Sequence, residues 1–388
     1  MKKICIIGGA GHIGFPLGLY LSSKKNTVYL YDKNKKSCKI INSSKSPHYE
    51  IEANKYIKRY KKFYNAGNDL SYVKNSDVII VCLGTPVNND SSPKIKEFLN
   101  ILRKLSPFLS KDQLIIIRSS VYPGTIEKIK KILNKKNSTI AYCPERILQG
   151  AALIELPKLG QIVSGVNQKS VKLARLFFEK NVTKKIIITS TFEAELIKLF
   201  SNALRYVQFA ISNEFYMICK NYGLSFEKIR KNMMIGYDRN NNLYKAGFAA
   251  GPCLVKDTMQ LSNLFNKKFF LGKSALKINQ NFPNFLIKNL EKNYKIKNKT
   301  IGILGMAFKS DVDDIRDSLS IKLEKILKTK KIRYLKSDEY YKDSKCVSKE
   351  FLIKKSDIII VAVPHKTYRK LKISKTKILI DTWNVINR

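Results

Sequence analysis

The chain of 388 residues is long enough for two or three domains, because a domain usually holds roughly 100 to 200 residues. Hydrophobic residues make up 44% of the chain and aromatic residues 10%, which excludes a disordered protein. A formal net charge of +43 would suit an anionic partner such as nucleic acid or a membrane surface. Because the excess lysines are spread along the whole chain, we interpret them as solvated surface residues that would also help to capture a phosphorylated ligand.

The seven cysteines are scattered, odd in number and without a CxxC pair, which argues against a disulfide framework and against a zinc site. No stretch approaches the roughly 20 consecutive apolar residues of a membrane span, and glycines interrupt the apolar run near the N-terminus. We therefore expect a cytoplasmic protein that binds neither a membrane nor a metal ion.

Apolar runs and helical periods predict an α/β, helical, α/β organisation along the chain. Strands that alternate with amphipathic segments are expected over residues 4–7, 28–31, 78–83, 114–118, 140–143 and 186–189. This alternation predicts a parallel sheet with helices on both faces. A single apolar stripe without Gly or Pro predicts a long helix over residues 192–219, followed by shorter helices to about residue 294. A smaller α/β domain is expected from Thr300, with strands over residues 301–305, 358–363 and 378–381.

A glycine-rich motif follows the first expected strand. It matches GxGxxG in the segment Gly9-Ala10-Gly11-His12-Ile13-Gly14. In such a turn the first glycine permits the tight bend, the second lets a pyrophosphate approach the backbone, and the third allows close packing of helix and strand. The motif predicts a dinucleotide site, with His12 and Ile13 at the start of the helix beside the cofactor.

An acidic residue at the end of the second expected strand indicates which dinucleotide binds. Asp32 stands roughly 20 residues after Gly14, where a carboxylate accepts hydrogen bonds from the ribose hydroxyls. This acid favours NAD over NADP. Lys33 and Lys35 follow directly and could hold a 2′-phosphate, so NADP stays an alternative.

Five segments resemble the UDP-glucose/GDP-mannose dehydrogenase family, in the family's order and over nearly the whole chain. They are Pro144-Glu145-Arg146, Glu195-Leu196-Ile197-Lys198-Leu199-Phe200-Ser201-Asn202, Gly251-Pro252-Cys253-Leu254-Val255-Lys256-Asp257, Leu304-Gly305-Met306-Ala307-Phe308-Lys309 and Asp313-Asp314-Ile315-Arg316. The resemblance implies an NAD-binding Rossmann-type domain over residues 1–190, a central helical dimerisation domain over residues 191–295 and a UDP-sugar-binding α/β domain over residues 296–388. A homodimer is expected on the same ground.

The resemblance also implies the chemistry, which is the oxidation of a sugar's primary alcohol to a carboxylate with two NAD per sugar. A thiolate retains the aldehyde between the two oxidations. It adds to the aldehyde, and the thiohemiacetal is oxidised to a thioester that water cleaves. Cys253 is the expected nucleophile, and the other six cysteines are expected to be structural.

Further catalytic roles follow from the resemblance. Lys198 and Asn202 lie four residues apart on one helix and would stabilise the alkoxide and the later oxyanion. Glu145 would act as general base in thioester hydrolysis, and Asp257 would fix the water or assist the base. Ser120 takes the place of the family's usual threonine, so the hydroxyl is retained.

Ligand contacts are also implied by the resemblance. The expected cofactor contacts, besides the glycine motif and Asp32, are Thr85 in the loop Thr85-Pro86, Ser120, Lys256 and Arg316. The expected contacts with the UDP-sugar, besides Glu145, Lys198 and Asn202, are Leu148, Arg239, Tyr244, Phe248, Gly251, Phe308 and Lys309.

The identity of the sugar stays open. The segments 144–147 and 155–156 resemble the branch that acts on UDP-N-acetylmannosamine or UDP-N-acetylglucosamine, whereas 253–257 resembles the UDP-glucose branch. Gln149 departs from the second glutamate that UDP-glucose enzymes commonly carry. A surface-polysaccharide precursor is the expected product. Two alternatives are a two-electron 3-hydroxyacid dehydrogenase, which would have no use for Cys253, and a basic nucleic-acid-binding protein.

Overall fold

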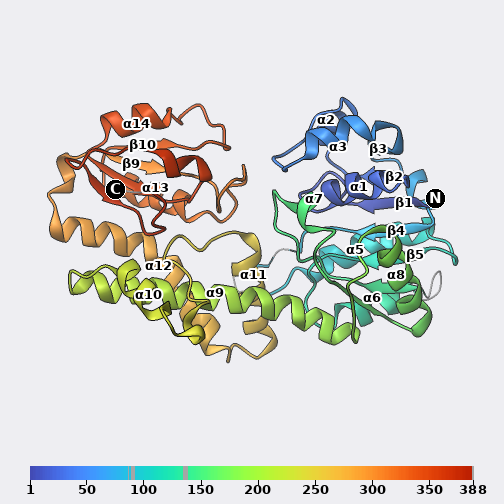
Figure 1. Cartoon of the computed structure of the whole chain (residues 1–388). Helices are drawn as coiled ribbons and strands as arrows, with labels where there is room; N and C mark the ends of the chain where they lie inside the picture. Colours follow the sequence, from blue (N-terminus) through green and yellow to red (C-terminus); the bar gives the residue numbers. More distant parts are fainter. Residues whose placement is uncertain (86, 89–91, 134–138, 387–388) are drawn as a thin grey trace. The chain divides into compact units, whose positions relative to one another are not determined.

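Figure 1 shows the computed structural model, which describes residues 1–85, 87–88, 92–133 and 139–386. The chain forms two compact units, Met1–Phe200 and Ser201–Arg388. Each unit contains its own β-sheet. Pro86 of the loop Thr85-Pro86 lies outside the described residues.

The first unit is built on a sheet that has eight strands in its described residues, in the order β3-β2-β1-β4-β5-β6-β7-β8. The strands are β1 Lys3–Ile7, β2 Thr27–Tyr31, β3 Tyr64–Gly67, β4 Val78–Val81, β5 Leu114–Ile117, β6 Ile140–Tyr142, β7 Gln161–Gly165 and β8 Ile186–Ile188. Neighbouring strands are parallel except β6 and β7. The central position of β1 between β2 and β4 confirms the predicted Rossmann-type α/β architecture.

The sequence-based prediction of this sheet missed two strands and did not include the reversed direction of β7 and β8. It missed β3 and β7 because their sequences, YNAG and QIVSG, lack the apolar run that marks the other strands. Pairing with neighbouring strands places them instead. The sheet is mixed rather than purely parallel, since β7 runs antiparallel to β6.

Helices cover both faces of this sheet. They are α1 Gly14–Ser23, α2 Lys35–Asn42, α3 Ala53–Arg59, α4 Ser71–Lys74, α5 Ile95–Leu105, α6 Thr125–Leu133, α7 Ala152–Glu155 and α8 Gln168–Asn181. Because side chains alternate along a strand, Ile4 and Ile6 join the core with α1 and α8, whereas Cys5 and Ile7 join the core with α5 and α6. The uninterrupted apolar sequence of β1 is therefore buried on both faces.

A long helix leads into the second unit. It is α9 Thr191–Asn221, which confirms the helix predicted over residues 192–219. It is followed by α10 Phe226–Met234, α11 Pro252–Leu264 and α12 Phe270–Asn293. The expectation of only short helices was wrong for α12, which continues over 24 residues with Pro283 inside it. Burial of Phe282 and Leu286 in the core offsets the hydrogen bond that Pro283 cannot donate.

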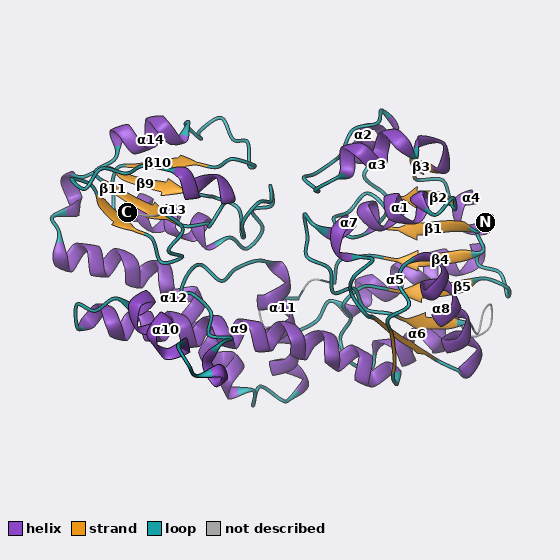
Figure 2. Ribbon diagram, viewed as in Figure 1, coloured by secondary structure: helices purple, strands orange, loops and turns teal. Residues whose placement is uncertain are grey.

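The chain after α12 forms a parallel sheet that has four strands in its described residues, in the order β10-β9-β11-β12. Its elements are β9 Ile301–Leu304, α13 Leu319–Thr329, β10 Tyr334–Ser337, α14 Lys349–Lys355, β11 Ile358–Val361 and β12 Ile378–Ile380. Helices α12 and α13 pack on one face of this sheet and α14 on the other (Figure 2). The three predicted strands are confirmed, whereas β10 was missed because its sequence, YLKS, is half polar.

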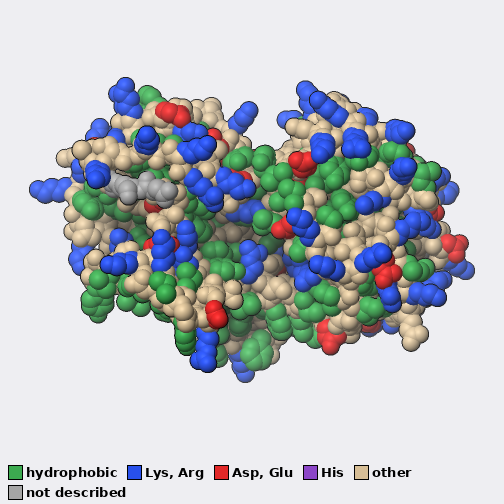
Figure 3. Space-filling view, viewed as in Figure 1, with side chains coloured by type: hydrophobic (Ala, Val, Ile, Leu, Met, Phe, Trp, Pro, Cys, Tyr) green, Lys and Arg blue, Asp and Glu red, His purple; other side chains and the backbone are tan. Residues whose placement is uncertain are grey.

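One face of the molecule carries its charge in a dispersed form (Figure 3). On the face drawn in Figure 3, Lys and Arg side chains are interspersed with polar and apolar ones, and few Asp and Glu side chains separate them. Among the described helices, none combines the length and the apolar composition that crossing a membrane requires.

Candidate active site

The glycine-rich turn joins β1 to α1 and is packed too closely for side chains. Gly8 has a φ of 82° and donates its N–H to the carbonyl of Tyr31 at 2.9 Å. A methyl group on Gly9 would lie 2.6 Å from the Cα of Leu30, and one on Gly14 would lie 2.3 Å from the oxygen of Gly8. Gly8 therefore makes the turn that was assigned to Gly9, while Gly9 allows the close approach to β2. The positive φ could not be read from the spacing of the motif.

Asp32 lies at the end of β2 beside this turn. One carboxylate oxygen accepts the N–H of Ala10 at 3.1 Å, and the other accepts the N–H of Asn34 at 2.9 Å. Helix α1 begins at Gly14, and its N-cap Ile13 makes no side-chain cap. The N–H of Phe15 donates to the carbonyl of Gly11 at 3.0 Å and Pro16 has no N–H, so the N–H groups before Phe15 are the ones that could meet an anion at this helix end. These residues fit a dinucleotide, since Gly11 to Gly14 can receive the pyrophosphate and Asp32 the ribose. The ring of His12 lies against the ring of His48, tilted by 49° with the ring centroids 4.2 Å apart.

Two further predicted cofactor contacts meet at the carboxyl end of this sheet. Thr85 follows β4, and its hydroxyl donates to the carbonyl of Ser120, which follows β5. Beside them the N–H of Leu83 donates to the hydroxyl of Ser119 at 2.8 Å. Ligands of open α/β sheets bind at this edge, so the position of Thr85 and Ser120 favours the predicted cofactor contact, which stays a prediction.

Glu145 lies in a buried ion pair that the sequence-based analysis did not foresee. Arg118 is 1% exposed, donates from Nε to Glu145 at 3.0 Å and from Nη2 to both Glu145 and Gln161, the latter at 3.1 Å. The other Glu145 oxygen accepts the N–H groups of Arg146 at 2.8 Å and Ile147 at 3.1 Å. Burial lowers the pKa of Arg118, but the charge of Glu145 and its hydrogen bond, together with smaller contributions from Cys82 and Cys143, outweigh burial and raise it. A carboxylate held in this way must release a donor before it can accept a proton.

Cys253 lies at the start of α11, where the helix leaves a tight loop. Gly251 precedes it with a φ of 102°, and a methyl group on Gly251 would lie 2.4 Å from the ring of Phe308. The predicted residues Gly251 and Phe308 are therefore in contact. Cys253 is exposed, whereas the other six cysteines are buried or half-buried. The accessible thiol is thus the one that the sequence singled out as nucleophile.

A polar cluster lies one helical turn beyond Cys253. Asp257 is fully buried, accepts a hydrogen bond from the amide of Asn202 at 2.5 Å, and pairs with the ammonium of Lys256. Lys198 precedes Asn202 by one turn on α9. Because an amide nitrogen has two N–H donors, Asn202 can hold Asp257 and still offer one donor to a ligand. The sequence predicted these residues singly but not the contacts among them.

Arg316 lies in the loop after β9 and forms a bidentate pair with Asp314. Its Nε is 3.0 Å from each carboxylate oxygen, and its Nη2 is 2.6 Å from Oδ2. The hydrogen bonds to Asp314 are the main cause of the raised pKa of Arg316, and the nearby Cys253 contributes to the same rise.

The loop from Tyr244 to Gly251 is anchored rather than loose. Asn213 accepts the N–H of Gly247 at 2.8 Å and donates to its carbonyl at 3.0 Å. A methyl group on Gly247 would lie 2.2 Å from the ring of Trp383. Phe248 is 5% exposed and packs in the core, whereas Tyr244 is half-buried. The ring of Phe248, which was expected to contact the sugar, is thus taken up by core packing.

The remaining predicted substrate residues are close to the surface. Leu148 is exposed and its N–H donates to Glu155 at 2.5 Å. Arg239 lies in a short 3-10 turn, with its guanidinium carbon 5.7 Å from the ring centroid of Tyr237. Lys309 is half-buried beside Phe308.

Comparisons with known proteins identify all three parts of the chain. The models of the UDP-glucose/GDP-mannose dehydrogenase family match residues 2–182 as the NAD binding domain, residues 192–281 as the central domain and residues 302–388 as the UDP binding domain. The first match confirms NAD as the cofactor.

Similar proteins match over nearly their whole length. A UDP-N-acetyl-D-mannosamine dehydrogenase of Methanocaldococcus jannaschii is 31% identical, covering 100% of this chain and 93% of the relative. A UDP-glucose 6-dehydrogenase of Rickettsia felis is 26% identical over 98% of this chain and 92% of the relative. The solved UDP-D-ManNAc dehydrogenase of Pyrococcus horikoshii has a TM-score of 0.89 and 27% identity, with 99% and 96% of the two chains covered. This chain belongs to the UDP-glucose/GDP-mannose dehydrogenase family.

Proposed function

We propose that this chain oxidises the C6 primary alcohol of UDP-N-acetylmannosamine to the carboxylate, with two NAD per sugar. The exposed thiol of Cys253, one helical turn from the buried Asp257, is the observation that carries the four-electron reaction. The choice of sugar is supported by the names of the relatives from Methanocaldococcus jannaschii and Pyrococcus horikoshii and by the segment 144–147. The product would be a uronic acid precursor of a surface polysaccharide, made in the cytoplasm.

Cys253, Asp257 and the polar residues of α9 have separate parts in the proposed reaction. NAD, when bound, accepts one hydride in each of the two oxidations. Between them the Sγ of Cys253 bonds to the aldehyde carbon as its proton passes to the aldehyde oxygen, and water later cleaves the thioester to the acid and the free thiol. Lys198 and Asn202 would stabilise the oxyanions, while Asp257 orients Asn202 and Lys256 through the contacts described above.

The first unit would supply the water-activating groups. Ser120 would position the water, and Glu145 would accept its proton after one oxygen leaves its donors. Arg118 keeps the Glu145 carboxylate in place until then. Phe308 and Lys309, with Arg316 nearby, would contact the nucleotide in the second unit, as the match to the UDP binding domain supports.

A panel of nucleotide sugars tests this proposal. Purified protein with excess NAD is given UDP-N-acetylmannosamine, UDP-N-acetylglucosamine, UDP-glucose or GDP-mannose, and NADH is counted against sugar consumed. We expect UDP-N-acetylmannosamine to have the highest kcat/KM and to yield two NADH per molecule.

Two results would contradict the proposal. A yield of one NADH per sugar, with the aldehyde as end product, would exclude the four-electron reaction. A higher kcat/KM for one of the other three sugars would exclude the proposed substrate.

The two alternatives have less support. A two-electron 3-hydroxyacid dehydrogenase has no use for the part of the chain that matches the UDP binding domain over residues 302–388. The hypothesis of a nucleic-acid-binding protein rests on the net charge alone, and on the face drawn in Figure 3 the Lys and Arg side chains are dispersed rather than gathered in one patch.

We also propose that the central segment 191–295 forms a homodimer through α9. One side of this helix exposes Leu204, Ile211, Phe215 and Ile218, with 38% to 60% of each residue accessible. Their spacing of three, four or seven residues places them on a single stripe. A contiguous apolar stripe of this kind is stabilised by packing against another apolar surface, and a second copy of the chain supplies the same stripe.

Charge on this stripe should separate the two copies. The variant with Leu204→Glu and Ile218→Glu is expected to sediment as a monomer where the unmodified chain sediments as a dimer, because burying two carboxylates in an apolar interface is strongly unfavourable. Ile235→Glu is the control, since Ile235 is 77% exposed and lies outside α9. A dimer that persists in the double variant would show that α9 is not the interface.

A further inference from the structure

The loop that follows β9, residues 305–317, carries three of the proposed ligand contacts, Phe308, Lys309 and Arg316. It begins at Gly305, which has a φ of 93° and donates its N–H to the carbonyl of Ser337 at 2.8 Å. The loop has no regular secondary structure up to α13. Contacts with other parts of the domain must therefore fix its conformation.

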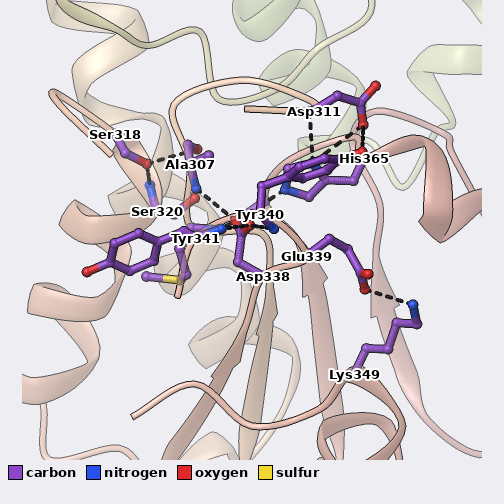
Figure 4. Close-up of polar contacts among 12 residues, drawn as sticks. Ala307, Asp311, Ser318, Ser320, Asp338, Glu339, Tyr340, Tyr341, Lys349 and His365 are labelled. Carbon is purple, nitrogen blue, oxygen red and sulfur yellow. Dashed lines mark hydrogen bonds and ion pairs between the residues drawn. The ribbon is translucent and has the colours of Figure 1, made fainter. Parts of the chain in front are cut away.

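Asp338, directly after β10, holds the start of this loop (Figure 4). Its Oδ2 accepts the N–H groups of Met306 at 2.6 Å and Ala307 at 3.0 Å. Its Oδ1 accepts those of Tyr340 at 2.8 Å and Tyr341 at 2.9 Å. Burial raises the pKa of Asp338, but hydrogen bonds from His365 and these backbone groups outweigh burial and lower it. Asp338 is thus a buried, ionised anchor with both oxygens in use.

His365 connects this anchor to the middle of the loop (Figure 4). The side chain is fully buried, and its Nδ1 accepts the N–H of Asp311 at 2.9 Å. Because Nδ1 accepts, the hydrogen-bond network assigns the ring proton to Nε2, which lies 3.2 Å from Oδ2 of Asp338 and donates to it. Asp311 has a φ of 55°, a left-handed conformation that needs such support.

The surroundings of His365 leave no room for a role in chemistry on a ligand. The rings of Tyr340 and Tyr368 lie 5.1 and 5.2 Å from its ring centroid. The carboxylate of Asp311 accepts the hydroxyl of Tyr340 at 3.2 Å and the N–H of Lys366 at 3.1 Å. Since these groups enclose the imidazole, any effect of His365 on a ligand has to pass through the loop.

The glycine turn of the first unit has a similar arrangement of a glycine with positive φ and an aspartate after the neighbouring strand, but among the described residues no histidine bonds to that aspartate. There Gly8 has a φ of 82° and donates to Tyr31, and the acid that follows β2, Asp32, accepts one N–H of the turn, that of Ala10. Asp32 is only half-buried and can still accept from a ligand. In contrast, Asp338 accepts a hydrogen bond from His365 as well as from the loop, so its carboxylate fixes the loop instead of facing a ligand.

We propose that His365 is a positioning residue for the nucleotide part of the substrate. Through Asp338 and Asp311 it holds loop 305–317 in the conformation that presents Phe308 and Lys309. The inference rests on the proposed function, because it takes the UDP group as the ligand of this loop. Contacts with the nucleotide are made equally before and during the reaction, so losing them raises KM and leaves kcat nearly unchanged.

Three substitutions in the full-length protein separate the two bonds of His365. His365→Ala removes both. His365→Asn can still accept the N–H of Asp311, because its amide oxygen lies as far along the side chain as Nδ1. His365→Gln can still donate to Asp338, because its amide nitrogen lies as far along as Nε2. We measure the Kd for UDP by calorimetry and the KM for the UDP-sugar and for NAD.

Because two hydrogen bonds are lost, His365→Ala is expected to weaken UDP binding roughly 10- to 50-fold and to raise the KM of the UDP-sugar by a similar factor. The KM for NAD and kcat should change by no more than about twofold, because His365 holds the loop at Asp311 and through Asp338, whereas Arg316, the expected cofactor contact, is held by its own pair with Asp314. His365→Asn and His365→Gln should each recover part of the UDP affinity.

Lys336→Met is the matched control. Lys336 is 6% exposed and lies in the same domain. Its ammonium pairs with Glu324 at 3.5 Å and with Asp343 at 2.7 Å, and both of these partners lie outside the loop 305–317. The substitution should lower the unfolding midpoint without changing the Kd for UDP.

The measurements distinguish failure of this inference from failure of the proposed function. A His365→Ala protein with unchanged UDP affinity, beside an unmodified chain that binds UDP and oxidises the UDP-sugar, would overturn the positioning role alone. An equal loss of UDP affinity in Lys336→Met would also overturn it, because general destabilisation would then be the cause. An unmodified chain that binds no UDP would overturn both proposals. If His365→Ala does not fold, His365→Gln decides in the same way.

Discussion

Replacing Cys253 by alanine is expected to abolish formation of the sugar acid, lowering its rate at least about 10³-fold. Without the thiol no thioester forms, so the second oxidation loses its covalent intermediate. The first oxidation needs no covalent bond to the enzyme, and at most one NADH per sugar should appear. NADH and the uronate product are measured together over many turnovers, with UDP affinity as a test that the second unit is intact.

Cys346→Ala is the matched control for this experiment. Cys346 is half-buried in the same unit, and burial raises the pKa of its thiol, so it is a poor nucleophile. The control should keep both the rate and the yield of two NADH. Formation of the uronate by Cys253→Ala at the rate of the unmodified chain would refute the assignment of the nucleophile.

The second large effect is expected on stability, at the buried pair of Arg118 and Glu145. Arg118→Met removes the positive charge and leaves the carboxylate of Glu145 buried without its partner, which should lower the free energy of unfolding by about 3–5 kcal/mol. For a domain of this size the unfolding midpoint should fall by roughly 6–20 °C. Differential scanning calorimetry of Arg118→Met and of the unmodified chain measures this shift.

The double variant of Arg118→Met with Glu145→Gln tests the cause of that loss. Glutamine keeps the oxygen that accepts the N–H groups of Arg146 and Ile147, but it carries no charge. The double variant should therefore be more stable than Arg118→Met alone. If it is equally unstable, lost packing against Phe178, whose ring centroid lies 5.1 Å from the guanidinium, explains the effect instead of the unpaired charge.

Much of the candidate site follows from local sequence. The spacing of Gly9, Gly11 and Gly14 and the acid Asp32 predicted the NAD domain, because a dinucleotide turn needs small residues at short, regular intervals. The apolar runs predicted the central strands, because strands buried on both faces must be apolar throughout. The motif around Cys253 placed the thiol at a site that the structure shows to be exposed.

The strands that the sequence did not reveal share one property. β3, β7 and β10 contain polar residues or glycine, and their places in the sheets depend on the neighbours with which they pair. Likewise α12 passes through Pro283 because its apolar side is buried. In these elements tertiary packing outweighs local preference.

The sequence by itself determined the family, the cofactor and the accessible thiol, since each depends on residues close together in the chain. Only the tertiary structure decided the partners of the charged groups. Arg118 meets Glu145, Asn202 meets Asp257 and His365 meets Asp338 across 27 or more positions. No local pattern encodes such contacts. They form because a buried polar group must find a hydrogen-bond partner, and the packing of strands and helices determines which one is within reach.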